Sequence, residues 1–404
     1  MLALEKPNEV GHVAGMRKFD VVIVGGAVVG SATAHSLRKL GYKGSIAIIE
    51  MDMSFARCCT ALSLGGLRQQ FSTPENIALS TFGLNLVRNL KQEFGPDADV
   101  GFKEQGYLIL ASDEGLATLE ENHATQKACG ADNVLLNPAE LKQRFPYLNT
   151  EDVAAGCFGR SGEGWLDPYS LMSLFRKSAL AQNVELITAR VTALAQDGIR
   201  VTSVTLDTGE VIACGELVNA AGAGAGALAA MAGIDLPVGP RKRYVYVLDC
   251  PDATDAVRKG PLTTDASGMY MRPEGRNFLC GNSPEEADEP PVDWEMDHGW
   301  FEERIWPHIA NRIPAFEAVK VVGSWVGHYD YNALDQNGIY GRHPLLNNFI
   351  FANGFSGHGI QQGPASGHLT AEQIVFGEYR SIDVRRLDYA RLAAGRLLFE
   401  KNII

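Results

Sequence analysis

The chain has 404 residues, a formal net charge of −12 and a hydrophobic fraction of 46%. This length exceeds one typical core, so we expect two domains. The acidic balance argues against nucleic acid or an anionic membrane as the main partner.

Targeting signals are equally sparse. No apolar run is long enough to span a bilayer, and residues 1–18 lack the apolar core of a signal peptide. The seven cysteines are mostly scattered, with no C-x-x-C pair. This usage indicates a reducing compartment, and we expect a cytoplasmic protein.

The first predicted unit spans residues 19–50 and is organised around a glycine-rich turn. A buried strand over 20–24 leads into Gly25-Gly26-Ala27-Val28-Val29-Gly30, then come a helix and a second strand that ends at Glu50. This order is typical of a dinucleotide-binding β-α-β unit. The glycines let the backbone approach a pyrophosphate, and Glu50 accepts hydrogen bonds from ribose hydroxyls. Ala27 stands where the pattern expects glycine, so its methyl leaves less room for phosphate.

A loop with the sequence Ser63-Leu-Gly-Gly-Leu-Arg68 follows. Its glycine pair and small residues indicate a backbone that passes close to something flat or anionic. Arg68 is therefore a candidate ligand-binding residue. The alternative is a surface or salt-bridging arginine.

The middle of the chain alternates predicted helices and strands. We expect helices over 76–94, 114–129, 137–145 and 169–181, and strands over 106–110, 185–194 and 198–206. The strand that ends in Leu217-Val-Asn-Ala-Ala-Gly222 predicts a second nucleotide contact, which makes the nucleotide domain discontinuous. Between 237 and 322, strand-like stretches alternate with acidic loops, which indicates a separate domain built on an antiparallel sheet.

The last informative stretch is Gly354-Phe-Ser-Gly-His-Gly359. A strand ends at Asn353 and a helix begins near Gly359, so backbone N–H donors are exposed at the helix start. His358 is a candidate base or metal ligand. No second His or Cys lies at ligand spacing, which favours a packing or hydrogen-bonding role.

Together these motifs resemble the D-amino-acid-oxidase-type FAD-dependent oxidoreductases, which include sarcosine oxidase, glycine oxidase and dimethylglycine dehydrogenase. The resemblance covers nearly the whole chain. Residues 65–72 and 395–403 resemble most a subgroup that includes an FAD-dependent assembly factor of respiratory complex I. Bacterial relatives in that subgroup are taken to be amine dehydrogenases.

The resemblance implies an α/β fold with two domains. A Rossmann-type FAD-binding domain would consist of three segments, 17–100, 168–236 and 335–404. An α+β substrate domain on a largely antiparallel sheet would consist of 101–167 and 237–334.

It also implies a set of FAD-binding residues. Glu50 would bind the adenosine ribose, Val191 the adenine, residues 63–67 the isoalloxazine, and residues 357–359 the N1–C2=O edge of the flavin. The full set is Gly25, Gly26, Ala27, Gly30, Glu50, Met51, Ser63, Leu64, Gly65, Gly66, Leu67, Val191, Ala221, Gly222, Gly327, Gly354, Ser356, Gly357, His358, Gly359, Ile360 and Gln361.

The implied reaction is oxidation of the C–N bond of an amino acid or a secondary or N-alkyl amine. Hydride passes to flavin N5, and water hydrolyses the resulting imine. The candidate catalytic residues are Arg68, Tyr270, His328 and Gln361, and we expect Tyr244 and Tyr329 to face the same pocket. No metal is expected. The partner is a small-molecule amine or amino acid, while the electron acceptor and oligomeric state stay open.

Three positions depart from sarcosine oxidase. Gln361 replaces a lysine that binds substrate carboxylate, Leu279 aligns with the oxygen-activating lysine, and His328 aligns with the cysteine that tethers FAD. We therefore expect a dehydrogenase rather than an oxidase, with noncovalent FAD. Cys58, Cys59 and His328 are the alternatives as covalent tethers.

Two other classes of protein compete with this interpretation. One is an FAD-holding assembly factor or electron-transfer subunit with little catalysis of its own. The other is an NAD-dependent dehydrogenase, which leaves residues 354–359 without a role.

Overall fold

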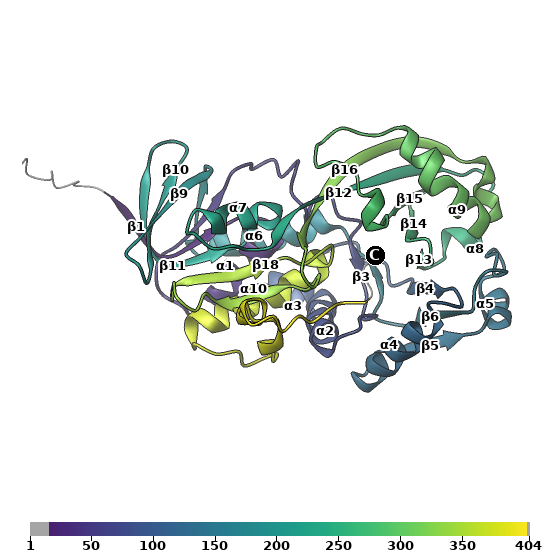
Figure 1. Cartoon of the computed structure of the whole chain (residues 1–404), viewed down its shortest axis with the longest axis horizontal. Helices are drawn as coiled ribbons and strands as arrows, with labels where there is room; N and C mark the ends of the chain where they lie inside the picture. Colours follow the sequence, from purple (N-terminus) through teal and green to yellow (C-terminus); the bar gives the residue numbers. More distant parts are fainter. Residues whose placement is uncertain (1–15, 402–404) are drawn as a thin grey trace, which may run out of the picture.

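The computed structural model describes residues 16–401. Residues 1–15, which belong to the N-terminal stretch without a signal-peptide pattern, lie outside this range. Residues 402 and 403 of the 395–403 motif also lie outside it. Figure 1 shows two lobes along the long axis, each built around its own sheet. The expected α/β fold with one parallel and one antiparallel sheet is confirmed.

The first lobe contains a mainly parallel sheet in the order β17-β18-β11-β1-β2-β8. Every residue of β2 is buried, as expected for a parallel strand that is covered on both faces. Helices α1 and α10 pack against each other so closely that a Cβ on Gly367 would lie 2.5 Å from Ala32. The strands are β1 (Arg17–Val24), β2 (Ile46–Glu50), β8 (Glu185–Thr188), β11 (Val211–Asn219), β17 (Ile339–Arg342) and β18 (Phe349–Asn353), with helices α1 (Val28–Lys39), α2 (Pro74–Arg88), α6 (Pro168–Ala181), α7 (Ala225–Ala230) and α10 (Gly359–Val375).

The second lobe contains an eight-stranded sheet in the order β16-β12-β15-β14-β13-β4-β6-β5. Its pairs are antiparallel except for β13 and β4. The strands are β4 (Tyr107–Ala111), β5 (Asn133–Leu136), β6 (Ala155–Gly159), β12 (Val238–Asp249), β13 (Leu262–Thr264), β14 (Met269–Glu274), β15 (Asn277–Asn282) and β16 (Lys320–Asn332), with helices α4 (Leu116–Ala128), α5 (Pro138–Arg144), α8 (Asp255–Arg258) and α9 (Trp306–Arg312). The segment boundaries proposed for the two domains stay a prediction.

Two expected elements are wrong in detail. The helix over 76–94 is interrupted at Asn89, so that α3 (Leu90–Phe94) follows α2 as a separate helix. The strand over 185–194 is also two strands. β8 pairs with β2, whereas β9 (Val191–Gln196) forms a hairpin with β10 (Val201–Leu206) that extends from β11. The apolar pattern continues across both breaks, which is why the sequence did not reveal them.

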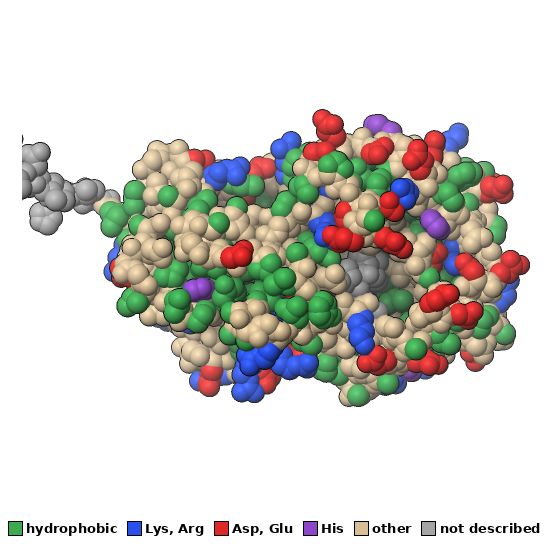
Figure 2. Space-filling view, viewed as in Figure 1, with side chains coloured by type: hydrophobic (Ala, Val, Ile, Leu, Met, Phe, Trp, Pro, Cys, Tyr) green, Lys and Arg blue, Asp and Glu red, His purple; other side chains and the backbone are tan. Residues whose placement is uncertain are grey.

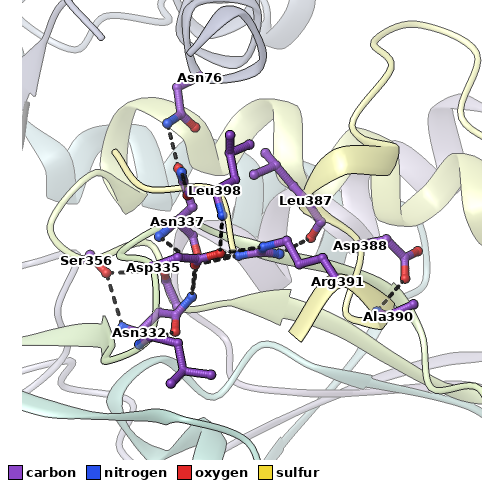
Figure 3. Close-up of polar contacts among 12 residues, drawn as sticks. Asn76, Asn332, Asp335, Asn337, Ser356, Leu387, Asp388, Ala390, Arg391 and Leu398 are labelled. Carbon is purple, nitrogen blue, oxygen red and sulfur yellow. Dashed lines mark hydrogen bonds and ion pairs between the residues drawn. The ribbon is translucent and has the colours of Figure 1, made fainter. Parts of the chain in front are cut away.

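A buried polar cluster, shown in Figure 3, holds the C-terminal segment against the loop between β16 and β17. Asp335 is fully buried and accepts two hydrogen bonds from Arg391, at 2.7 and 2.8 Å, and one from the Leu398 backbone at 3.1 Å. The chain then reaches the start of α2. There the Glu400 carboxylate accepts from the Ser72 amide at 2.8 Å and from Asn76 Nδ2 at 2.7 Å.

Candidate active site

A cavity of about 520 Å³ is lined by residues from both lobes. One end, here called the nucleotide end, is lined by Gly25, Ala27, Glu50, Met51 and Arg190. The other, here called the substrate end, is lined by Arg68, Arg243, Tyr270, Tyr329 and His358.

The nucleotide end is shaped by backbone atoms that approach very closely. A Cβ on Gly25 would lie 2.1 Å from the Ala220 carbonyl oxygen, and one on Gly30 would lie 1.9 Å from the Gly25 carbonyl oxygen. Gly25 also has a φ of +106°, which favours glycine. The turn between β1 and α1 therefore requires these glycines, and it places the amides at the start of α1 beside the cavity.

Glu50 closes β2 at the edge of this turn. Its carboxylate accepts from the Gly26 amide at 2.7 Å and from the Asp52 amide at 3.0 Å. These bonds fix the carboxylate at the cavity wall. A carboxylate has about four acceptor directions, so it keeps capacity for ribose hydroxyls.

Many of the FAD-binding residues expected from the sequence line this one cavity, although their role there stays a prediction. Others do not line it: Gly26 and Gly30 lie in the turn itself, Val191 is 6% exposed within the core of the first lobe, and Ser356 bonds to the Asn332 amide. Those that line it are Gly25, Ala27, Glu50, Met51, Ser63, Leu64, Gly66, Ala221, Gly222, Gly327, Gly357, His358, Gly359, Ile360 and Gln361, and those that do not are Gly26, Gly30, Gly65, Leu67, Val191, Gly354 and Ser356.

Arg68 is 2% exposed at the substrate end. Its Nη1 donates to the Gln70 carbonyl at 2.7 Å, and its Nη2 lies 3.1 Å from His358 Nε2. Gln361 Oε1 accepts from the Arg68 amide at 2.8 Å, so Gln361 holds the backbone beneath this guanidinium. Arg68 is therefore not a surface arginine.

His358 lies at the start of α10 and is buried. Burial, and then the charge of Arg68, hold the pKa of this imidazole well below its usual value. The ring is neutral and accepts from Arg68 through Nε2, and it packs edge-on against Phe71. Residues 16–401 contain no cluster of His, Cys, Asp or Glu that could hold a metal.

Of the other candidate aromatic residues, three line the cavity and one packs in the core. Tyr270, His328 and Tyr329 line the cavity. His328 Nε2 lies 2.8 Å from the Asp293 carbonyl, and its ring packs at a tilt of 36° against Trp294 with centroids 4.0 Å apart. The expectation for Tyr244 is wrong, because its ring packs against Trp300 and does not line the cavity.

Three buried charged residues at or near this end were missed. Asp330 accepts from the Gly354 and Phe355 amides and thereby fixes the turn before α10. Burial raises the pKa of Asp330 to about 6. Glu163 accepts from the Gln69 amide and Gln70 Nε2, both at 2.7 Å, and burial raises its pKa to about 7.

The third missed residue is Arg243, in the middle of β12. Val245, two residues further along β12, also lines the cavity. Residues two positions apart on a strand lie on the same face of the sheet, so this spacing was the available signal for Arg243. Arg272, another buried arginine of this lobe, does not line the cavity and donates instead to the Leu64 and Pro273 carbonyls.

A glycine turn and an acidic residue on a parallel sheet, facing an antiparallel sheet across a shared cavity, are typical of a dinucleotide-binding protein. The chain belongs to the FAD dependent oxidoreductase family, whose model matches residues 20–373. Its cofactor is FAD, and the glycine turn fits a bound pyrophosphate because its backbone is free of side chains at Gly25 and Gly30, where a Cβ would collide with backbone. The NAD-dependent alternative is thereby set aside.

Similar proteins agree with this assignment. The chain is 41% identical to "FAD-dependent oxidoreductase domain-containing protein 1" of Xenopus laevis, over 95% of this chain and 85% of that one. It is 26% identical to mitochondrial sarcosine dehydrogenase of Mus musculus, over 95% of this chain and 43% of that one. The structure of L-proline dehydrogenase from P. horikoshii is similar with a TM-score of 0.83 and 27% identity, covering 95% of this chain and 100% of that one.

Among residues 16–401, no helix combines the length and apolar character needed to cross a membrane.

Proposed function

We propose that this oxidoreductase oxidises the C–N bond of an amino acid or a secondary or N-alkyl amine. The observation that carries the proposal is the substrate end of the cavity, where two buried guanidinium groups and two tyrosines adjoin the start of α10. Sarcosine dehydrogenase and L-proline dehydrogenase, two of the similar proteins, are named for amine-containing substrates.

Bound FAD would supply the acceptor for two electrons and one proton from the substrate carbon. The chain would supply binding and electrostatics. Amides at the start of α10 favour negative charge in the cavity, and Asp330 fixes the turn that aims them. Neutral His358 accepts a hydrogen bond from Arg68 and so orients its guanidinium.

Exclusion of water is the second contribution of the chain. Tyr107, Leu262 and Tyr270 are each 5% exposed or less and line the substrate end. In such surroundings a charge-assisted bond from Arg68 to a substrate carboxylate gains strength. Arg68 would therefore bind an anionic end of the substrate, or the polar edge of the flavin.

A preference for dehydrogenase over oxidase activity is part of the proposal. Leu279, at the position aligned with the oxygen-activating lysine, is an apolar residue of β15 that does not line the cavity. We also retain the expectation of a reducing, cytoplasmic location, since all seven cysteines are free.

A screen of N-alkyl amino acids and secondary amines with a dye acceptor, with and without oxygen, tests the proposal. We expect at least one amine to reduce the dye, and to do so faster than it consumes oxygen. Flavin-loaded protein that no amine reduces without oxygen would instead support an FAD-holding protein. Efficient oxygen consumption would contradict the preference for dehydrogenase activity.

A further inference from the structure

The C-terminal segment, here residues 395–401, is mostly exposed but carries one buried carboxylate. Phe399 is 54% exposed, whereas Glu400 is 2% exposed. A buried carboxylate is costly unless hydrogen bonds satisfy it. Glu400 accepts from the Ser72 amide at 2.8 Å, from Ser72 Oγ at 2.7 Å and from Asn76 Nδ2 at 2.7 Å. These partners lie at the start of α2, where a negative charge is also favourable.

Buried contacts fix the position of Glu400. Leu398, two residues earlier, donates its amide to Asp335 at 3.1 Å and accepts from Asn337 Nδ2 at 2.6 Å, as Figure 3 shows. The Glu400 amide donates to the Asp335 carbonyl at 3.3 Å. The C-terminal segment is therefore a fixed support for the Glu400 carboxylate.

The first route from Glu400 to the cavity passes through Phe71. Ser72, which Glu400 binds at the amide and the hydroxyl, directly follows Phe71 in the chain. The Phe71 ring is fully buried, its centroid lies 4.6 Å from Arg68 Cζ, and it packs edge-on against His358. Arg68 and His358 both line the substrate end. A displacement of Ser72 would therefore move the ring against which these two side chains pack.

The second route passes through Asn76 and α10. Asn76 donates from Nδ2 to Glu400 and accepts at Oδ1 from Gln362 Nε2 at 3.2 Å. Gln362 follows Gln361, whose Oε1 accepts from the Arg68 amide at 2.8 Å. Asn76, Gln361 and Gln362 are each 5% exposed or less, and a buried network of this kind constrains its members. Both routes therefore end at Arg68.

We propose that Glu400 is a positioning residue of the candidate active site, and that it holds Arg68 in place through Phe71 and through Asn76. Glu400 does not line the cavity, so it acts only through these neighbours. The inference rests on the proposed function for the role of Arg68. It also assigns a function to the 395–403 motif, of which residues 395–401 are described.

The midpoint potential of bound FAD tests the inference, and its measurement by equilibration with a reference dye needs no substrate. Reduced flavin carries more negative charge than oxidised flavin, so a cation in the cavity favours reduction. We expect Arg68→Gln to lower the ratio of reduced to oxidised flavin at a fixed potential by roughly tenfold. Glu400→Gln should lower this ratio by roughly threefold, because Arg68 is then displaced and not removed.

The sign of the change separates positioning from a direct effect of charge. Removal of the negative charge of Glu400 would by itself favour reduced flavin and raise the ratio. Displacement of Arg68 lowers it. An unchanged or raised ratio in Glu400→Gln would overturn the inference, even if the variant is less stable, because that result indicates a structural role alone. An unchanged ratio in Arg68→Gln would overturn it as well, since Arg68 would then not act on the flavin.

A double variant, Arg68→Gln with Glu400→Gln, shows whether Glu400 acts through Arg68. If it does, the double variant has the same ratio as Arg68→Gln alone, because no guanidinium is left to displace. Additive effects would overturn the inference. If Glu400→Gln does not fold, Glu400→Asp replaces it in both measurements. Aspartate keeps the charge but is one methylene shorter, so we expect a smaller fall of the same sign, and no fall would overturn the inference.

Lys401→Gln is the matched control. Lys401 is next to Glu400 and pairs with Glu121 of α4, on the second lobe, at 2.7 Å. Figure 2 shows many Asp and Glu side chains on the surface of this lobe, and both partners of this pair are exposed. An exposed ion pair contributes little, so the flavin ratio should stay unchanged. A fall as large as that in Glu400→Gln would overturn the inference, because docking of the whole segment would then be responsible.

The outcomes separate this inference from the proposed function. If no amine reduces the flavin but the variants change the ratio as expected, the proposed function fails and the positioning role of Glu400 stands. If amines are oxidised but Glu400→Gln leaves the ratio unchanged, the inference alone fails.

Discussion

Backbone atoms form one end of the cavity, and side chains form the other. The nucleotide end is formed by backbone atoms of β1, β2 and β11, which approach within distances that only glycine allows. The substrate end is formed by side chains that come from distant parts of the chain and are held by buried charges. We therefore expect changes at the nucleotide end to act through steric collision, and changes at the substrate end to act through electrostatics. The following predictions test that contrast.

The largest effect is expected at the nucleotide end. Gly30→Ala places a Cβ 1.9 Å from the Gly25 carbonyl oxygen, so the turn must move. We expect loss of most bound FAD and destabilisation of about 1–3 kcal/mol, as for other overpacked sites. Flavin absorbance per protein and the unfolding midpoint measure both. Gly239→Ala is the control, since a Cβ there meets nothing within 4 Å. Full flavin content in Gly30→Ala would contradict a steric role.

The substrate end should respond to pH through Glu163. Its pKa is raised from 4.5 to about 7, chiefly by burial, so the folded state binds the proton more tightly than the unfolded state. Stability from this group is present below pH 4.5 and is lost as pH rises through 7. The difference between the folded and unfolded pKa of Glu163 corresponds to about 3 kcal/mol.

Glu163→Gln should remove this loss, because glutamine does not titrate. Urea unfolding of FAD-loaded protein between pH 5 and pH 8 measures the slope for both proteins. Parallel curves for the variant and the unaltered protein would show that Glu163 does not titrate in this range.

The effect expected at Arg68 is on binding and not on stability. Arg68→Lys keeps the charge and loses the forked geometry, so binding of a carboxylated amine should weaken by about 1–3 kcal/mol. Saturation kinetics and FAD content should be measured on the same preparation, because loss of flavin would mean that Arg68 serves the cofactor. If Arg68→Lys and Arg68→Ala both keep full flavin and unchanged saturation, the anchor lies elsewhere.

No effect is expected at the two cysteines beside the cavity. Burial raises the pKa of the Cys58 thiol to about 11 and that of Cys59 to about 12, so neither forms the thiolate that a covalent link requires. Acid precipitation should release all FAD into the supernatant, from the unaltered protein and from Cys59→Ser alike. Colour that stays in the pellet would contradict noncovalent binding.

The same contrast explains what the sequence could predict. The turn at 25–30, Glu50 and the 354–359 motif are local patterns whose spacing is fixed by one strand and one helix, and some residues of each line one cavity. Arg243 and Glu163 carry no such local pattern. Their importance comes from partners far along the chain, such as Glu289 and Gln70, and from burial that only the packed sheets create. Val191 was expected to bind the adenine from a single strand over 185–194. The structure has two strands there, and Val191 lies in the core of the first lobe.

The bond between Ser72 and Glu400 joins residues 328 positions apart. Ser72 lies four residues after Arg68, so the start of α2 is completed only by a residue that the ribosome adds 328 positions later. A ribosome adds roughly 5–20 residues per second. Tens of seconds therefore pass between the synthesis of Ser72 and that of Glu400. Until then the Ser72 amide and the Asn76 side chain at the start of α2 lack the carboxylate that accepts their hydrogen bonds.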